Sequence, residues 1–145
     1  MTDVTETTRT TEKTDLERAR EYFSNDAFAT DAAGIEITEV GRQYARVELD
    51  LDDRHYNAIG AVMGGVYYTM ADFAFAIASN FDSVPCVTLG GHITYLTAAR
   101  GKHLIAETKC IKDGKRTCCF QVSITDELGT EVAMVTLEGY KIQTS

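Results

Sequence analysis

Residues 55–80 have the sequence HYNAIGAVMGGVYYTMADFAFAIASN and determine the architecture that we expect. Their polar beginning leads to the pair Gly64-Gly65, which allows the chain to turn tightly. The apolar run after this pair contains neither Pro nor Gly and is long enough for a helix, which we predict over Gly64 to about Asn80. Because this helix is apolar on every side, we expect it to be buried all round.

Asp72 is the single carboxylic acid in this helix. No Lys, Arg or His lies within one helical turn of it, and its neighbours at helical spacing are Tyr68, Thr69, Phe75 and Ala76. A carboxylate in these surroundings loses solvation, so its pKa should be raised. A structural acid that bonds Tyr or Thr hydroxyls is the alternative interpretation. The pattern is hard to explain by structure alone, so Asp72 is the first candidate for catalysis.

The composition limits the class of protein and its partners. A chain of 145 residues is long enough for one domain with a substantial core. The 22 Asp and Glu against 14 Lys and Arg give a net charge of −8, which argues against a nucleic-acid-binding surface. The N-terminus lacks the apolar core of a signal peptide, and the apolar runs are shorter than the roughly 20 residues of a membrane span. We therefore expect a cytoplasmic protein whose partners include neither nucleic acid nor membrane.

The four cysteines are expected to be free thiols. They form no CxxC pair, no His stands at metal-ligand spacing from them, and they are Cys86, Cys110, Cys118 and Cys119. Cysteines of this kind act as small buried hydrophobes in a reducing compartment. The sequence therefore predicts no metal site.

The flanking segments predict a short helix and six strands. The Thr-rich residues 1–13 should form a flexible tail, which leaves 14–145 as a single domain. A capping box at Thr14 and Glu17 indicates a helix to about Ser24. Alternating apolar residues and turn residues predict a hairpin over 34–51, a loop over 52–61, and strands over 86–97, 103–112, 116–126 and 131–142. This order favours an α+β fold in which a mainly antiparallel sheet wraps the apolar helix.

The strand at 86–97 contains an interruption. We expect Val87, Leu89, Ile93 and Tyr95 to share one face of it. Gly90-Gly91 suggests a bulge, or a place where a ligand or another backbone approaches closely.

Several motifs within residues 28–142 resemble those of hotdog-fold acyl-CoA thioesterases of the phenylacetic acid degradation type. The central stretch HYNAIGAVMGGVYYTMADFAFA matches the family's Asn, Gly-Gly and Ala-Asp spacing. VTLGGHITYLTAARG resembles the next strand and its exit loop, and IKDGKRT and DELGTEVAMVT resemble the last two turns. The resemblance implies a hotdog fold, an antiparallel sheet around a long central helix. It also implies hydrolysis of a small aromatic or short- to medium-chain acyl-CoA without a cofactor, since coenzyme A is part of the substrate.

The resemblance implies roles for residues at matching positions. Asp72 matches the family's general base or nucleophile, and Gly64 matches the helix-start glycine whose N–H polarises the thioester carbonyl. Asn57 matches an asparagine beside the reacting centre, and Thr88 a hydroxyl that helps to place the attacking water. Asn57 could instead stabilise its own loop, and Thr88 could be an ordinary strand residue. Met63 stands where the family usually carries His, which puts a step that needs a polar ring in question.

Further residues are expected to contact the substrate. Contacts to the acyl part are expected from Met63, Gly65, Tyr68 and Gly90. The phosphates of coenzyme A need local positive charge, and the candidates are Arg100 and Lys102 beside His103, with Lys112 and Arg116 nearby in the next hairpin, together with Lys115. Ordinary solvated turn charges are the alternative reading of these cations.

The spacing of Gly64 and Asp72 bears on assembly. They are eight residues apart, which on one helix is about 12 Å along the axis. A base that acts on a carbonyl directly or through one water must lie within roughly 3 to 6 Å of it. Two antiparallel copies of the helix would bring Gly64 of one chain towards Asp72 of the other. We expect a homodimer with two shared sites, and a dimer of dimers is the larger assembly that we consider.

Two other functions compete with thioester hydrolysis. The Met63 departure is consistent with a hotdog protein that binds acyl-CoA without turnover. A thioester dehydratase on the same fold would need a histidine base near Asp72, which only His55 or His92 could supply.

Overall fold

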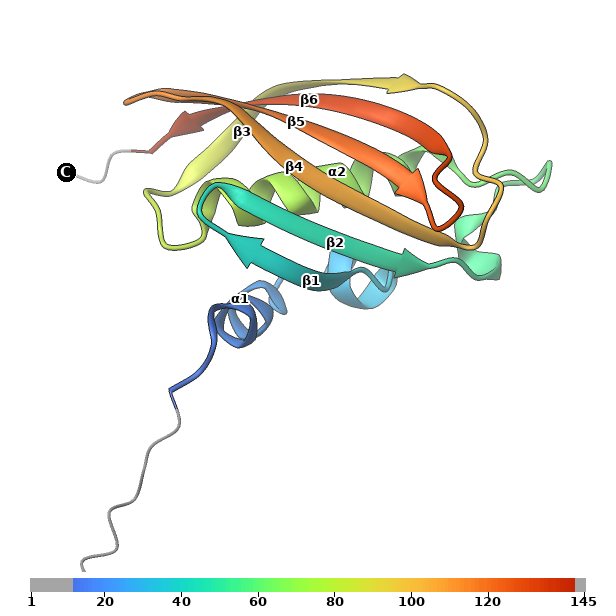
Figure 1. The fold of residues 1–145 in the computed structure, drawn as a ribbon, viewed down its shortest axis with the longest axis horizontal. Helices are drawn as coiled ribbons and strands as arrows, with labels where there is room; N and C mark the ends of the chain where they lie inside the picture. The colour runs from blue at the N-terminus through green and yellow to red at the C-terminus, as the bar shows by residue number, and fades with distance from the viewer. Residues whose placement is uncertain (1–11, 143–145) are drawn as a thin grey trace, which may run out of the picture.

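The computed structural model, which describes residues 12–142, contains a six-stranded antiparallel sheet curled around the helix α2 (Gly64–Asn80). The strands are β1 (Glu36–Gly41), β2 (Tyr44–Asp50), β3 (Cys86–Tyr95), β4 (His103–Asp113), β5 (Thr117–Asp126) and β6 (Glu131–Lys141), and their spatial order is β1-β2-β4-β5-β6-β3. Figure 1 shows α2 on the concave side of this sheet. The α+β arrangement predicted from the sequence is confirmed. The predicted tail, residues 1–13, lies outside the described residues except for Glu12 and Lys13.

The N-terminal helix α1 (Asp15–Phe23) begins at its predicted cap, where the Thr14 hydroxyl accepts the N–H of Glu17 at 3.2 Å. The helix buries Ala19 and Phe23. Arg20 Nε donates to the carbonyl of Ile37 in β1 at 2.8 Å, which ties α1 to the sheet edge. None of the helices among residues 12–142 is long and apolar enough to cross a membrane.

Two short helical turns form where we expected only linking chain. The π-helical turn η1 (Phe28–Ala32) follows α1, and the 3-10 turn η2 (Asp53–His55) precedes α2. The η2 turn is fixed at its start because the Asp52 carboxylate accepts the N–H of Arg54 while His55 Nδ1 accepts the N–H of Asp52. These side-chain hydrogen bonds give the loop a defined shape that its composition did not reveal.

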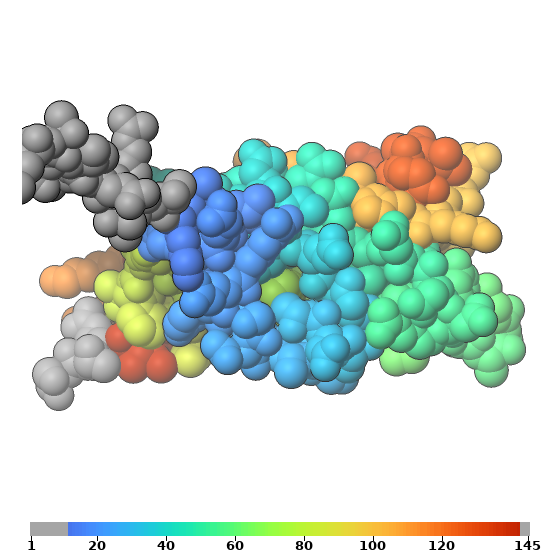
Figure 2. Space-filling view, turned by 90° about the horizontal axis from the view of Figure 1, so that it is seen from below, coloured from blue at the N-terminus to red at the C-terminus, as the bar shows by residue number. Residues whose placement is uncertain are grey.

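The helix α2 is the core of the molecule, but it is not buried all round. Its bounds agree with the prediction, and most of its side chains pack against the sheet. On the side away from the sheet, α1 and η1 lie over it, and Figure 2 shows only a small part of α2 in a hollow between them. Gly65 and Asp72 are exposed, and Thr69 and Ala76 are half-buried. The expectation of complete burial is therefore wrong, because the sheet and η1 leave this stripe of α2 uncovered.

The strand β3 contains the predicted bulge, since its register against β6 shifts between Thr88 and Gly90. The bulge reverses the alternation of side chains along the strand. Cys86 Sγ lies 3.5 Å from the buried Cys118 thiol, and the Tyr95 ring packs against Tyr67 of α2, so both ends of β3 point toward the core. The residue after Cys86 therefore points outward, and the prediction that Val87 and Tyr95 share a face is wrong.

The four cysteines are free thiols, as predicted. Cys86 and Cys118 come from strands on either side of β6. Their sulfurs meet above Gly139 of β6, where a Cβ would lie 2.8 Å from Cys118 Sγ and 2.9 Å from Phe75 Cζ. Only a residue without a side chain fits between these atoms.

Candidate functional site

The first residues of α2 present unpaired backbone donors. Val66 N–H donates to the Met63 carbonyl at 2.9 Å, but within residues 12–142 the N–H groups of Gly64 and Gly65 have no protein acceptor. Such free N–H groups, together with the helix dipole, favour negative charge. They can therefore stabilise an oxygen on which charge develops during a reaction.

At the N-terminal end of α2, Tyr95 is a site residue that the sequence analysis missed. A Cβ on Gly64 would lie 2.7 Å from the Tyr95 hydroxyl oxygen, so the ring lies directly against Gly64. Tyr95 also packs against Tyr67, with ring centroids 6.2 Å apart. The glycine therefore admits the Tyr95 ring within its own chain, in addition to leaving its N–H unhindered. No sequence pattern indicated this contact, which depends on where β3 runs across α2.

Asn57 organises the loop that leads into α2. Its Oδ1 accepts the N–H groups of Ile59 at 3.1 Å and Ala61 at 3.0 Å. The side-chain oxygen of Asn57 therefore stabilises its own loop, which was the alternative interpretation of this residue. In the part of the chain that the structure describes, the Asn57 amide nitrogen donates no hydrogen bond, so it remains free to contact a ligand. Met63 caps α2 without a side-chain hydrogen bond and is exposed.

Asp72 lies midway along α2 on the uncovered stripe. The side chain is exposed overall, but α2 and η1 remove part of the water from its carboxylate. This desolvation raises the pKa of Asp72, and the negative charge of Asp26 raises it further. The predicted direction of the pKa shift is confirmed. Asp26 was not predicted, because nothing in the sequence pattern brings the residues before η1 to this part of α2.

Thr88 lies on the side of β3 that faces α2, because it follows Cys86 by two residues before the bulge. β3 runs antiparallel to α2: Tyr95 contacts Gly64, and Cys86 N–H donates to Asn80 Oδ1 at 2.7 Å. Thr88 is thus displaced toward the C-terminal end of α2, away from Gly64. Gly90 faces open space, since a Cβ there would meet no atom within 4 Å.

The predicted catalytic residues therefore form two half-sites in one chain. Gly64 and Asn57 lie at the N-terminal end of α2, whereas Asp72 lies about 12 Å further along the axis. Tyr68 lies between them on the helix and is half-buried. The two half-sites of one chain cannot act on the same carbonyl group.

The histidines do not provide a base for Asp72. His55 is buried, its Nδ1 accepts the N–H of Asp52, and its Nε2 lies 2.7 Å from the Ala33 carbonyl, to which it donates. Both ring nitrogens are therefore occupied within the loop. His92 is exposed on β3, with Nε2 3.4 Å from the Thr94 hydroxyl. Among residues 12–142 of one chain, neither histidine contacts Asp72, as a dehydratase would need.

The cations expected to bind phosphates are not gathered in one place. Arg100 and Lys102 precede β4, and Lys112 and Arg116 flank its other end. Ten residues of extended strand span about 33 Å, so the expectation that the two groups lie near each other is wrong. The sequence suggested proximity because it does not show how far an uninterrupted strand carries the chain.

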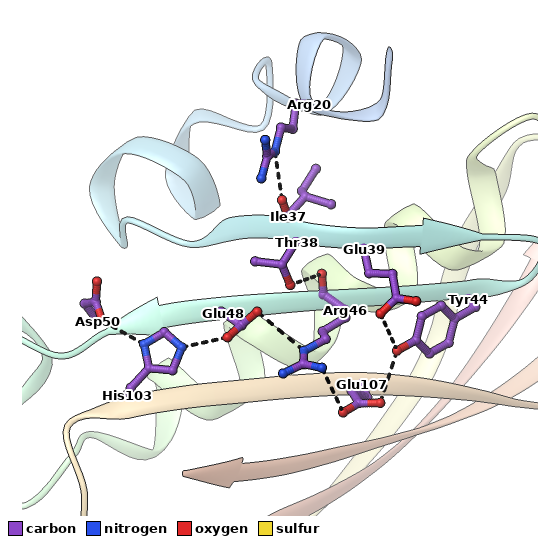
Figure 3. A network of polar contacts seen from close by, with 10 residues as sticks. All are labelled: Arg20, Ile37, Thr38, Glu39, Tyr44, Arg46, Glu48, Asp50, His103 and Glu107. Carbon is purple, nitrogen blue, oxygen red and sulfur yellow. Dashed lines mark hydrogen bonds and ion pairs between the residues drawn. The ribbon is translucent and has the colours of Figure 1, made fainter. Parts of the chain in front are cut away.

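Carboxylates accept the backbone N–H groups at Arg100 and Lys102, and two further carboxylates flank His103. The Asp126 carboxylate accepts the N–H groups of Arg100 and Gly101, each at 2.9 Å, and its pKa is lowered because these and other backbone hydrogen bonds outweigh its burial. His103 lies between Glu48 and Asp50, 2.7 Å from each (Figure 3). The same acids hold the pKa of His103 above its ordinary value through hydrogen bonds.

A search of protein-family models matches residues 59–133 to the thioesterase superfamily. Among known proteins, the chain is 28% identical over 128 residues to a protein of Archaeoglobus fulgidus named "putative esterase", covering 88% of this chain and 83% of that protein. It is 27% identical over 127 residues to the acyl-coenzyme A thioesterase PaaI of Escherichia coli, covering 87% and 90%.

Solved structures of thioesterases have a fold similar to that of this chain. The E. coli PaaI protein from the phenylacetic acid degradation operon has a TM-score of 0.82 at 21% identity, covering 90% of this chain and 96% of that one. A hypothetical thioesterase from Streptococcus pneumoniae, solved with coenzyme A, has a TM-score of 0.76 at 26% identity, covering 85% and 99%. The hotdog fold expected from the sequence motifs is confirmed.

Proposed function

The chain belongs to the thioesterase superfamily, a family of thioester hydrolases, and from that premise we propose that it hydrolyses an acyl-CoA to a free acid and coenzyme A. The observation that carries this proposal is Asp72. Its carboxylate has no cationic partner among residues 12–142, its pKa is raised, and it lies on a helix whose first N–H groups find no acceptor there. The names of two similar proteins support the choice of thioester. The relative from E. coli is an acyl-coenzyme A thioesterase, and the structure from S. pneumoniae holds coenzyme A.

The proposed reaction uses both half-sites on the same thioester. The Gly64 N–H donates to the thioester carbonyl oxygen and stabilises the negative charge that forms there. Asp72 takes a proton from a water molecule, which Thr88 helps to place, and the water oxygen bonds to the acyl carbon. Collapse of the tetrahedral intermediate breaks the C–S bond. Coenzyme A leaves as a thiolate, so it needs no strong general acid, and the proton passes to it or to solvent.

We propose that the active unit is a homodimer with two shared sites. β3 is an edge strand with the exposed apolar side chains Val87 and Leu89, and the exposed Leu96 directly follows it. An edge of this kind is prone to pair with another chain. Pairing of two β3 strands about a two-fold axis would set the uncovered stripes of two α2 helices antiparallel. Gly64 of one protomer would then approach Asp72 of its partner, which removes the separation within one chain.

Replacement of Asp72 tests the proposal. Asp72→Asn and Asp72→Ala should lower kcat by about 100-fold or more, since general-base catalysis contributes about 10²–10⁴. Release of coenzyme A is followed by chromatography over a panel of aromatic and straight-chain acyl-CoAs, because the four cysteines of the protein would react with thiol reagents. Glu36→Gln, an exposed acid-to-amide change on β1 at the opposite sheet edge, is the matched control.

Two results would contradict the proposal. Wild-type turnover by both Asp72 variants would remove the acid from the mechanism. Tight binding of acyl-CoAs without release of coenzyme A by the wild-type protein would favour the non-catalytic binding function instead.

A further inference from the structure

The Tyr95 hydroxyl lies close to the first N–H group of α2. A Cβ on Gly64 would be 2.7 Å from the Tyr95 hydroxyl oxygen. An ideal Cβ is about 2.5 Å from the nitrogen of its own residue, so this hydroxyl oxygen is at most about 5.2 Å from the Gly64 nitrogen. Two donors this close can reach one oxygen atom together, because each hydrogen bond spans about 2.9 Å.

Both donors lie off the N-terminal end of the helix. Gly64 is the first residue of α2, and the first N–H groups of a helix point out of its N-terminal end without an acceptor in the helix. The Cα–Cβ bond of a helical residue tilts toward the same end. Because the Tyr95 hydroxyl occupies the place that a side chain of Gly64 would take, it lies on the side toward which the N–H groups point.

The Tyr95 hydroxyl is available to a ligand. Among residues 12–142 it makes no hydrogen bond to another protein group, and Tyr95 is 54% exposed in the single chain. Together with Gly64 it lines a pocket of about 440 Å³, which continues along Leu96 and Ala98. A molecule that enters this pocket can therefore meet the N–H of Gly64 and the O–H of Tyr95 at the same time.

The Tyr95 side chain is held in position along its whole length. Its backbone pairs with Ala133 of β6, which fixes the start of the side chain. Its ring packs against the buried Tyr67, with ring centroids 6.2 Å apart, and its hydroxyl end lies against Gly64. A donor that is fixed before the substrate arrives needs no reorganisation when negative charge develops.

We propose that Tyr95 is a catalytic residue whose O–H donates to the thioester carbonyl oxygen beside the Gly64 N–H. The inference rests on the proposed function and adds a second donor to it. The hydrogen bond strengthens as the carbonyl oxygen gains negative charge, so it stabilises the transition state more than the bound substrate. The proton stays on Tyr95, and the bonds that form and break are those of the hydrolysis described above. Both donors come from one protomer, so this role does not depend on where Asp72 comes from.

Tyr95→Phe separates this role from packing, because it removes the hydroxyl and keeps the ring. Turnover is measured as release of coenzyme A from the acyl-CoA that the wild type hydrolyses fastest. The value of kcat should fall about 100-fold, as when one donor to an oxyanion is removed. KM should stay within about threefold, because the hydrogen bond acts mainly in the transition state.

The matched control is Tyr140→Phe, which removes the hydroxyl of a tyrosine that is 44% exposed on β6. Tyr140 does not line the pocket at Gly64, so this variant should keep the kcat of the wild type. Urea titration of both variants checks that the loss of a hydroxyl leaves the fold as stable as before.

A binding comparison tests the contact with the carbonyl oxygen without turnover. In an Asp72→Asn background, calorimetry compares butyryl-CoA with its thioether S-butyl-CoA, which lacks the carbonyl oxygen. The thioester should bind more tightly than the thioether. Tyr95→Phe should reduce this preference about two- to tenfold, which corresponds to the loss of one hydrogen bond.

The outcomes separate this inference from the proposed function. If Asp72→Asn abolishes turnover but Tyr95→Phe keeps the wild-type kcat, the proposed function stands and the inference is overturned. A loss confined to KM would also overturn it, since the hydroxyl would then bind substrate without stabilising the transition state. If the wild type hydrolyses no acyl-CoA, the proposed function fails and the binding comparison decides. A preference for the thioester that Tyr95→Phe reduces would support the contact of Tyr95 with the carbonyl oxygen, and an unchanged preference would reject it.

Discussion

At the scale of single residues, Asp72 combines three properties that a general base needs. It has no cationic partner in the part of the chain that the structure describes, it has lost part of its hydration, and a second carboxylate, Asp26, lines the same pocket beside α2. Each of these disfavours the ionised form and makes the carboxylate a stronger base.

The charge of Asp26 should be visible in the pH dependence of activity. Asp72 must be ionised to accept a proton, so kcat/KM rises with pH through its raised pKa. Asp26→Asn removes a negative charge and lowers that pKa. The acidic limb of the pH profile should therefore shift to lower pH. The profile is measured at low ionic strength, where screening is weak. Asp31→Asn, a change of an exposed acid in η1, is the control. An acidic limb that stays in place or moves to higher pH in Asp26→Asn would contradict the influence of Asp26 on the pKa of Asp72.

The sequence was sufficient to find Asp72 but not its neighbours. Helical spacing shows which residues lie within one turn, so the absence of a cation and the raised pKa could be predicted. Tyr95 lies against Gly64, and Asp26 lines the same pocket as Asp72. Both pairs join segments that are far apart in the chain. Such contacts depend on how β3 and η1 are placed over α2, which no local pattern encodes.

At the scale of elements, glycines and alternating apolar residues set the bounds of α2 and of the strands. Gly64-Gly65 marks the start of the helix, and the Asp113-Gly114 turn separates β4 from β5, as predicted. The face that each β3 residue presents could not be predicted, because one extra residue at the bulge reverses the alternation. The exposure of Asp72 was missed for a related reason: an apolar helix can be covered by its own sheet or by a second chain.

Gly139 tests how tightly β3, β5 and β6 pack on α2. Gly139→Ala would bring a Cβ within 2.8 Å of Cys118 Sγ and 2.9 Å of Phe75 Cζ, and would overlap the Cys86 thiol. The free energy of unfolding should fall by about 1–3 kcal/mol, measured by denaturant titration. Gly90→Ala is the control, since its Cβ meets no atom within 4 Å and should change stability by less than about 0.5 kcal/mol. Equal free energies of unfolding for the two variants would contradict tight packing around Gly139, because they would mean that the surrounding side chains make room for a methyl group.

At the scale of the whole molecule, our proposal divides the active site into two halves that one chain carries apart from each other. The free N–H groups lie at one end of α2, and the acid lies about 12 Å along it. β3 is an exposed edge of the sheet, and at Gly91 and Tyr95 it lies against Tyr68 and Gly64 of α2, the helix that carries the uncovered stripe. The prediction of two copies was made from helix geometry and the sequence alone. The surfaces that they would use required the structure.

Complementation between two inactive variants tests the shared site most directly. Asp72→Asn lacks the base, and Gly64→Pro lacks the N–H donor while keeping a residue that is favoured at the first position of a helix. Because a Cβ at this position would lie 2.7 Å from the Tyr95 hydroxyl, circular dichroism first checks that Gly64→Pro folds. If each site takes Asp72 from one protomer and Gly64 from its partner, a mixed dimer contains one intact site. Statistical exchange of the two variants should then restore up to about one quarter of wild-type turnover. Chains that exchange, as shown by differently tagged protomers, but recover no activity would contradict a site built from two copies.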